Sequence, residues 1–109
     1  MPINEPREWF ERELPAAVQA DPKKIEGFDG TLLFNIAGDK GGAWTLDIRN
    51  QQLSIKAEAV PTPDISITMK EGDFVNFINK KLSGQMAFMT GKLKVKGNMQ
   101  LAMKLNGLL

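Results

Sequence analysis

The side chains able to do chemistry in this 109-residue chain are carboxylates, lysines and hydroxyls, because the sequence contains no histidine, cysteine or tyrosine. A chain without cysteine has no thiolate nucleophile, iron–sulfur cluster or cysteine-bound zinc. A chain without histidine has no serine–histidine pair and no imidazole metal ligand. The composition therefore argues against an enzyme and against a bound metal or other cofactor.

Two groupings of polar residues and glycines have structural explanations. Glutamates alternate with arginines between residues 5 and 13, which indicates a solvated helix face rather than a metal cage. Segment 38–42 contains three glycines and precedes an alternating apolar run. It therefore indicates a hairpin, since a phosphate-binding loop would lie between a strand and a helix.

Positive charge gathers in the second part of the chain, although the net charge is only +1. Residues 1–64 hold seven basic and eleven acidic residues, and residues 65–109 hold seven basic and two acidic ones. Lys92, Lys94 and Lys96 alternate along one predicted strand. They either protect an edge strand from aggregation or attract anionic head groups or a phosphate tail. Nucleic acid is not expected as a partner, because no aromatic side chains lie between these lysines.

The elements that must position these side chains follow from hydrophobic periodicity. A helix is expected to begin at Asn4 as its cap, to be interrupted at Pro15 and to end near residues 21–22. Apolar and polar residues then alternate in five predicted strands, centred on residues 32–36, 44–48, 53–57, 65–69 and 93–95. The first three strands are expected to form an antiparallel meander, and prolines 61 and 63 an extended corner before the fourth.

Two further helices complete the pattern. The first is predicted over residues 71–82, with acidic residues in its first turn and two lysines in its last. The second is predicted over residues 99–108, capped by Asn98. Because all five strands direct apolar residues to one face, helices must cover that face. The sequence therefore predicts a two-layer α+β domain over residues 1–109, with the opposite sheet face, which carries Thr45, exposed to water.

The last predicted helix has more apolar surface than packing on one core requires. Its apolar residues cover more than half of the circumference, against about 100° for a helix lying on a core. Apart from Met1, every methionine follows residue 68, and methionine suits surfaces that adapt to varied guests. The surplus is explained by ordinary core packing, by a partner chain or by a hydrophobic ligand.

Residues 91–105 read Gly-Lys-Leu-Lys-Val-Lys-Gly-Asn-Met-Gln-Leu-Ala-Met-Lys-Leu. This run resembles the C-terminal signature of the sterol-carrier-protein-2 family. Segment 64–68 followed by Asp73-Phe74 also fits the family, and segment 33–36 fits it loosely. The resemblance covers roughly residues 28–109 and carries the expectations that follow.

The resemblance implies a five-stranded mixed, mainly antiparallel sheet with helices over one face and an apolar tunnel between them. Family members bind fatty acids, fatty acyl-CoA, sterols or other lipids and have no catalytic residues or cofactor of their own. Gln85 would hydrogen-bond a ligand head group. By matching position, the tunnel border would consist of Phe74, Phe77, Ile78, Gln85, Phe88, Met89, Met99, Ala102 and Met103.

We therefore expect a non-enzymatic lipid-binding and transfer protein, monomeric and weakly attracted to anionic membrane surfaces. A cytoplasmic location is expected, because the sequence shows no signal peptide, membrane-spanning run or peroxisomal tail. The alternative is a structural or interaction module that packs its apolar last helix on a partner or an accessory enzyme. A hydrolase using aspartate or lysine chemistry is the third hypothesis, to be tested by substitution of Asp64 or Asp73.

Overall fold

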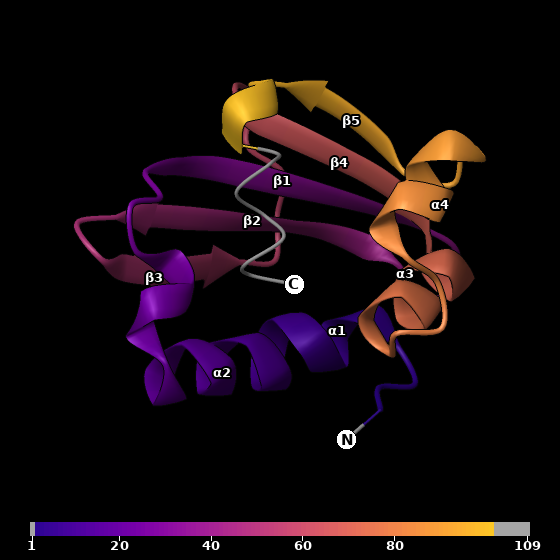
Figure 1. The fold of residues 1–109 in the computed structure, drawn as a ribbon, viewed down its shortest axis with the longest axis horizontal. Helices are drawn as coiled ribbons and strands as arrows, with labels where there is room; N and C mark the ends of the chain where they lie inside the picture. Colours follow the sequence, from indigo (N-terminus) through magenta and orange to yellow (C-terminus); the bar gives the residue numbers. More distant parts are fainter. Residues whose placement is uncertain (1, 102–109) are drawn as a thin grey trace.

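The computed structural model describes residues 2–101 (Figure 1). The helical elements are α1 (Pro6–Glu8), the π-helical turn η1 (Trp9–Glu13), α2 (Leu14–Ala20), the 3₁₀ turn η2 (Pro22–Ile25), α3 (Glu71–Ile78) and α4 (Gly84–Met89). The strands are β1 (Gly30–Ala37), β2 (Gly42–Arg49), β3 (Gln52–Lys56), β4 (Ile65–Lys70) and β5 (Lys94–Gly97). Residues 99–101 are helical, where the last helix is predicted to begin, and its remainder lies outside the described residues.

The N-terminal helical run begins one residue later than predicted. Glu5 is the N-cap rather than Asn4, because the Glu8 carboxylate accepts the backbone N–H of Glu5 at 3.1 Å and also that of Asn4. This reciprocal capping box satisfies donors that the first helical turn leaves free. The backbone does not leave the helix at Pro15, contrary to the prediction: Glu13 and Leu14 keep right-handed helical angles, and the α-helical pattern is interrupted just before Pro15 by the π-helical turn η1, which passes directly into α2.

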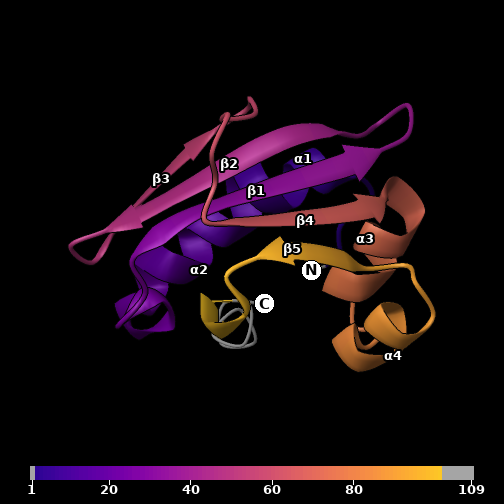
Figure 2. The same ribbon diagram turned by 90° about the horizontal axis from the view of Figure 1, so that it is seen from above.

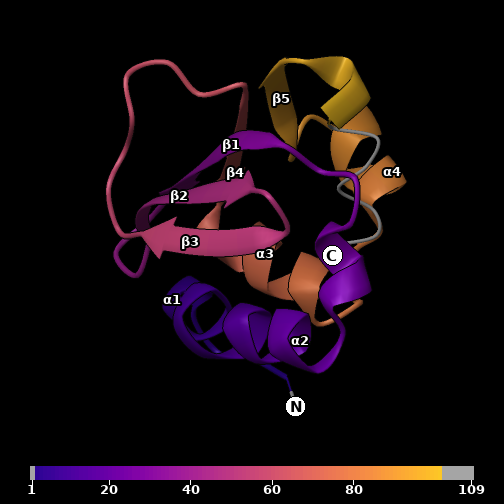
Figure 3. The same ribbon diagram turned by 90° about the vertical axis from the view of Figure 1, so that its left-hand side faces the viewer.

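The five strands form one mixed sheet in the order β3-β2-β1-β4-β5. The pairs β1–β2, β2–β3 and β4–β5 are antiparallel, and β1–β4 is parallel. The parallel pair arises because segment 57–64 carries the chain from the edge strand β3 to the far side of β1 (Figure 3). The mixed, mainly antiparallel sheet and the initial meander are confirmed.

Asp64 joins the end of this crossover to β1 and β5. Its carboxylate accepts the Thr31 backbone N–H at 2.8 Å and the Thr31 hydroxyl at 3.2 Å. Its carbonyl accepts the Asn98 backbone N–H at 2.9 Å. Gly97, at φ +117°, passes so close that a Cβ would lie 2.4 Å from the same carbonyl oxygen. Asp64, Gly97 and Asn98, which belong to the segments that resemble the family, therefore connect β1, β4 and β5.

The helices α1 and α2 lie against one face of the sheet (Figure 2, Figure 3). The opposite face is exposed along β4 and β5, as predicted, at Thr68, Lys70 and Lys94. Thr45 on β2 contradicts that prediction, since only 3% of its surface is exposed. Its hydroxyl donates to the Glu58 carbonyl at 2.6 Å, because segment 57–64 passes over this part of the sheet.

Helix α3 is shorter than predicted, ending at Ile78 rather than near residue 82. Lys80 adopts φ +65°, and the backbone N–H groups of Lys81 and Leu82 both turn back to the Asn76 carbonyl, at 2.8 and 3.1 Å. Ser83 then starts α4, its hydroxyl accepting the Met86 N–H at 3.1 Å. The two lysines expected in the last turn of a long helix therefore lie in the connection between two short ones.

Candidate functional site

Five aromatic rings pack together at the centre of the core. Phe10 stacks on Trp44 with ring centroids 4.6 Å apart and on Phe74 with centroids 5.3 Å apart. Trp9 meets Phe74 edge to face at 5.7 Å, and Phe34 contacts the edges of Phe10 and Phe74. Phe74, predicted to border a ligand, is fully buried in this cluster.

A pocket of about 380 Å³ lies where the N-terminal helical run meets the α3–α4 connection. This volume is within the range of ligand-binding pockets, about 300–1,000 Å³. Its walls are Trp9, Phe77, Ile78, Lys80, Leu82, Ser83 and Gly84. We call it the α3 pocket.

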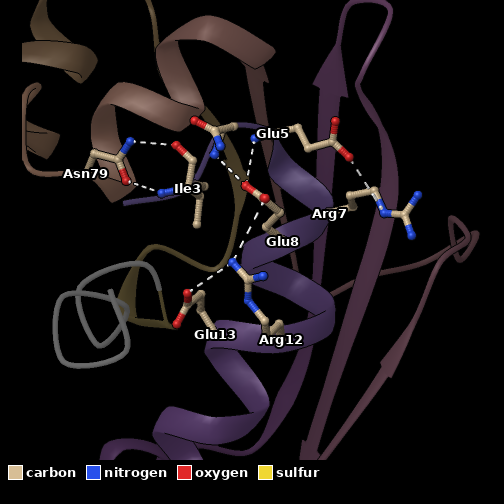
Figure 4. A network of polar contacts seen from close by, with 8 residues as sticks. Ile3, Glu5, Arg7, Glu8, Arg12, Glu13 and Asn79 are labelled. Carbon is tan, nitrogen blue, oxygen red and sulfur yellow. Dashed lines mark hydrogen bonds and ion pairs between the residues drawn. The ribbon is translucent and has the colours of Figure 1, made fainter. Parts of the chain in front are cut away.

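The α3 pocket exists because α3 stops at Ile78 and the chain turns back beside the N-terminal segment. Two hydrogen bonds between Ile3 and Asn79 hold the segment against that turn (Figure 4). A Cβ at Gly84 would lie 3.3 Å from the Phe77 ring. The start of α4 therefore passes directly over Phe77.

The structure brings two of the predicted ligand-border residues, Phe77 and Ile78, to this pocket. Three others lie on α4 with exposed side chains: Gln85, Phe88 and Met89. Met99, two residues after the end of β5, is also exposed. Ala102 and Met103 lie outside the described residues.

Trp9 and Leu82 also line the α3 pocket, although neither is among the nine border residues predicted from the sequence. The available signal for Trp9 is its pairing with Phe10 in an otherwise charged segment. Neighbouring residues on a helix point about 100° apart, so two adjacent rings reach different surroundings.

A second cavity, of about 530 Å³, lies at the junction of β4, α3 and the loop after α4. We call it the lysine pocket, because Lys70, Lys92 and Lys94 line it. Its other walls are Ala37, Thr68, Met69, Asp73, Thr90 and Gly91. A third hollow, of about 320 Å³, lies between α2 and β3 and is lined by Pro15, Val18, Gln19, Leu53 and Ile55.

The acidic N-terminal segment forms an exposed network of ion pairs, as predicted (Figure 4). Arg7 lies 3.8 Å from Glu11, and Arg12 lies 3.9 Å from Glu8. The backbone N–H groups of Asn4 and then Glu5, together with Arg12, lower the pKa of the Glu8 carboxyl below its ordinary value. Within residues 2–101, no group of three acidic, histidine or cysteine side chains is placed to hold a metal ion.

Comparisons with known proteins connect this fold to one family. "Hydroxysteroid dehydrogenase-like protein 2" of Homo sapiens is 42% identical over 86 residues, covering 78% of this chain and 21% of that protein. The chain spans about a fifth of the length of the first curated relatives it matches. In the part of the chain that the structure describes, no helix is long and apolar enough to cross a membrane.

Two solved structures share the fold over most of both chains. The solution structure of the sterol carrier protein domain 2 of Helicoverpa armigera has a TM-score of 0.73 and 29% identity, covering 99% of this chain and 91% of that one. The palmitated SCP2L2 of Aedes aegypti has a TM-score of 0.74 and 28% identity, covering 90% and 88%. The family model described as "SCP-2 sterol transfer family" matches residues 11–109. With the α+β architecture and the five-stranded mixed sheet, this match shows that the chain belongs to the SCP-2 sterol transfer family.

Proposed function

We propose that this chain binds a hydrophobic ligand and carries it between membranes without changing it chemically. The ligand class is a fatty acid, a fatty acyl-CoA, a sterol-like molecule or another lipid. The observation that carries the proposal is the α3 pocket, walled by the apolar side chains of Trp9, Phe77, Ile78 and Leu82. Family membership and the palmitated Aedes aegypti neighbour support a lipid as the occupant.

The chemistry of the α3 pocket suits a long hydrocarbon. Each buried methylene contributes about 0.8 kcal/mol, so an acyl chain needs few polar contacts. Ser83 lines the pocket, and its oxygen accepts the Met86 N–H. The Ser83 hydroxyl proton therefore remains available to donate to a carboxylate or ester oxygen of the ligand.

We further propose that the ligand extends beyond the α3 pocket toward α4 and the last helix. The predicted border residues outside the pocket are Gln85, Phe88, Met89, Met99, Ala102 and Met103. Gln85 lies one position after Gly84, which lines the pocket. Its side-chain amide has both a donor and an acceptor for a head group.

We propose that the protein acts as a carrier and not as an enzyme, as a monomer in the cytoplasm and with no cofactor. Asp64, one of the two carboxylates named for a hydrolase, already accepts two hydrogen bonds from Thr31. Its position between strands gives it a structural role. We also propose a weak contact with an anionic membrane surface, to which the basic residues after residue 64 would be attracted.

The proposal is tested by native mass spectrometry of the protein purified from cells, followed by lipid extraction. A monomer carrying a co-purified lipid is the expected result. An empty, stable dimer, or a stable complex with an enzyme, would instead support the alternative of an interaction module built on the last helix.

The binding site is located with a fluorescent long-chain fatty acid and two matched variants. Ile78 and Ile55 are both half-buried, but Ile78 lines the α3 pocket and Ile55 lines the hollow beside β3. Ile78→Glu should weaken binding about tenfold or more, because it replaces an apolar wall of the pocket with a charged group that a hydrocarbon chain would have to desolvate. Ile55→Glu should leave binding unchanged; the reverse result would move the site to the β3 hollow. Met103→Glu should also weaken binding, which tests the predicted border on the last helix.

A further inference from the structure

The short helix α4 exposes large apolar side chains. Met86, Phe88 and Met89 are 53%, 54% and 71% exposed, whereas Ala87 between them is fully buried. Ala87 faces the core, so the helix turns its longer neighbours outward. The Thr90 hydroxyl donates to the Met86 carbonyl at 2.7 Å and closes the last turn. The apolar side chains are therefore presented to solvent by a capped helix.

The lysine pocket lies directly beside these apolar side chains. Thr90 and Gly91, which follow α4, and Lys92 at the next position all line it. Lys70 reaches it from the end of β4 and Lys94 from the start of β5. Figure 2 shows α4 next to the segment that leads into β5. Exposed apolar side chains on α4 therefore adjoin a pocket lined by three lysines.

The cations of this surface are not neutralised by neighbouring carboxylates. Among residues 2–101, every ion pair joins side chains between positions 5 and 49, so Lys70, Lys92 and Lys94 take part in none of them. Asp73 is the single carboxylate among the residues that line the pocket. Three ammonium groups against one carboxylate leave a positive surface that favours an anionic partner.

We propose that α4 and the lysine pocket together dock onto an anionic phospholipid bilayer. Apolar side chains beside lysines fit the boundary between head groups and acyl chains, where methionine and phenylalanine enter the apolar layer and ammonium groups meet lipid phosphates. The N-terminal helical run is unsuited to this role, because its exposed arginines are paired with glutamates.

This inference rests on the proposed lipid transfer, because docking serves to load and unload the α3 pocket. Ser83 and Gly84 line that pocket and lead directly into α4. A docked α4 would therefore hold this side of the α3 pocket close to the bilayer. The lysine pocket would receive the phosphate of a lipid head group beside it.

The test measures co-sedimentation of the full chain with vesicles of phosphatidylcholine alone or of phosphatidylcholine with phosphatidylserine. Binding is expected only to the anionic vesicles and should be largely lost at about 0.5 M sodium chloride, where charges are screened within a few ångströms. Lys92→Gln with Lys94→Gln should weaken binding about 25-fold, about fivefold for each lysine. Lys23→Gln with Lys24→Gln, two exposed lysines on η2, is the matched control and should leave binding unchanged.

Insertion of α4 is measured separately with Met86→Trp. Trp9 and Trp44 are each only 6% exposed, and the wild-type chain measured with the same vesicles gives the emission change that these two residues contribute, including any change at Trp9 when lipid enters the α3 pocket. Anionic vesicles should shift the emission of the new tryptophan to shorter wavelength, and phosphatidylcholine vesicles should not. Binding without this shift would contradict docking through α4.

Fatty-acid binding in solution, measured on the same Lys92 and Lys94 variant, separates this inference from the proposed function. Retained fatty-acid binding with weakened vesicle binding supports docking. A wild-type chain that binds fatty acid but no anionic vesicles overturns docking alone. A chain that binds anionic vesicles but no fatty acid overturns the proposed carrier function and leaves docking standing. If the lysine variant weakens binding of coenzyme A and not of vesicles, the pocket serves a soluble phosphate ligand and the docking proposal is wrong.

Discussion

Ile3 and Asn79 exchange two hydrogen bonds across 76 positions of sequence: the Ile3 N–H donates to Asn79 Oδ1 at 2.8 Å, and Asn79 Nδ2 donates to the Ile3 carbonyl at 2.9 Å (Figure 4). Asn79 is the C-cap residue that follows α3. One amide side chain therefore satisfies both backbone groups of a buried residue and fixes the N-terminal segment beside the α3 pocket.

Asn79→Ala should lower the free energy of unfolding by about 1–3 kcal/mol, because it leaves the N–H and carbonyl of Ile3 without partners. Urea denaturation measures the change. Asn76→Ala is the matched control, since Asn76 is exposed on the same helix and should change stability by less than about 0.5 kcal/mol. Equal effects of the two substitutions would show that the Ile3–Asn79 bonds contribute nothing specific.

Phe10→Ala should be among the most destabilising substitutions in the chain, at about 3–5 kcal/mol. The Phe10 ring is fully buried and stacked between Trp44 and Phe74, so its removal leaves a cavity that these rings cannot fill. Phe88→Ala removes the same group from an exposed position and should change stability by about 0.5 kcal/mol or less. Thermal and urea unfolding measure the stability of the two variants. A loss of stability in Phe10→Ala as small as that in Phe88→Ala would mean that the aromatic cluster repacks around the missing ring.

Gly97→Ala should destabilise the joint between β4 and β5 by about 1–3 kcal/mol. The backbone there has φ +117°, and the new Cβ would lie 2.4 Å from the Asp64 carbonyl oxygen. Gly72→Ala should instead raise the free energy of unfolding, because Gly72 is a helical residue with open space where a Cβ would lie. The expected increase in the free energy of unfolding is about 0.4–1 kcal/mol. If Gly72→Ala destabilised the protein as much as Gly97→Ala, the steric explanation would be contradicted.

Glu8 should titrate below its ordinary value of 4.5, because its ionised carboxylate accepts backbone N–H groups at the start of α1. A folded-state pKa below the unfolded one stabilises the fold above the unfolded value, and this contribution disappears as the pH falls through the folded value. Glu8→Gln should therefore be less stable than the wild type at neutral pH and approach it at acid pH. NMR titration of the Glu8 side chain and urea unfolding at both pH values measure these effects; a midpoint above 4.5 would contradict the capping-box geometry.

Much of the fold could be predicted from local pattern. Alternation at Leu32, Phe34 and Ile36 predicted a strand with one buried face, and all three side chains are buried. The end of α3 could not be predicted in this way. Phe77, Ile78 and Leu82 have the spacing of one apolar helix face, so the sequence favours a helix that continues to residue 82. In the structure the N–H groups of Lys81 and Leu82 instead donate to the Asn76 carbonyl, and Ser83 caps a new helix.

The candidate site was predicted less completely than the fold. Phe77 and Ile78 do line a pocket, whereas Phe74, one turn earlier on the same face of α3, lies inside the aromatic cluster. Trp9 reaches the same pocket from a segment 68 positions earlier in the sequence than Phe77. Such a meeting of distant side chains depends on how elements pack, which periodicity does not encode.

By itself, the sequence determined the α+β class, the alternating faces of the strands and the excess of positive charge after residue 64. These properties depend on the identity and spacing of neighbouring residues, so they can be read locally. Only the tertiary structure decided that β4 runs parallel to β1, that segment 57–64 buries Thr45, and that Lys70 joins Lys92 and Lys94 around one cavity beside α4. Each of these depends on the path of the chain between elements, because a crossover, a covering segment and a shared pocket all bring together residues that are distant in sequence.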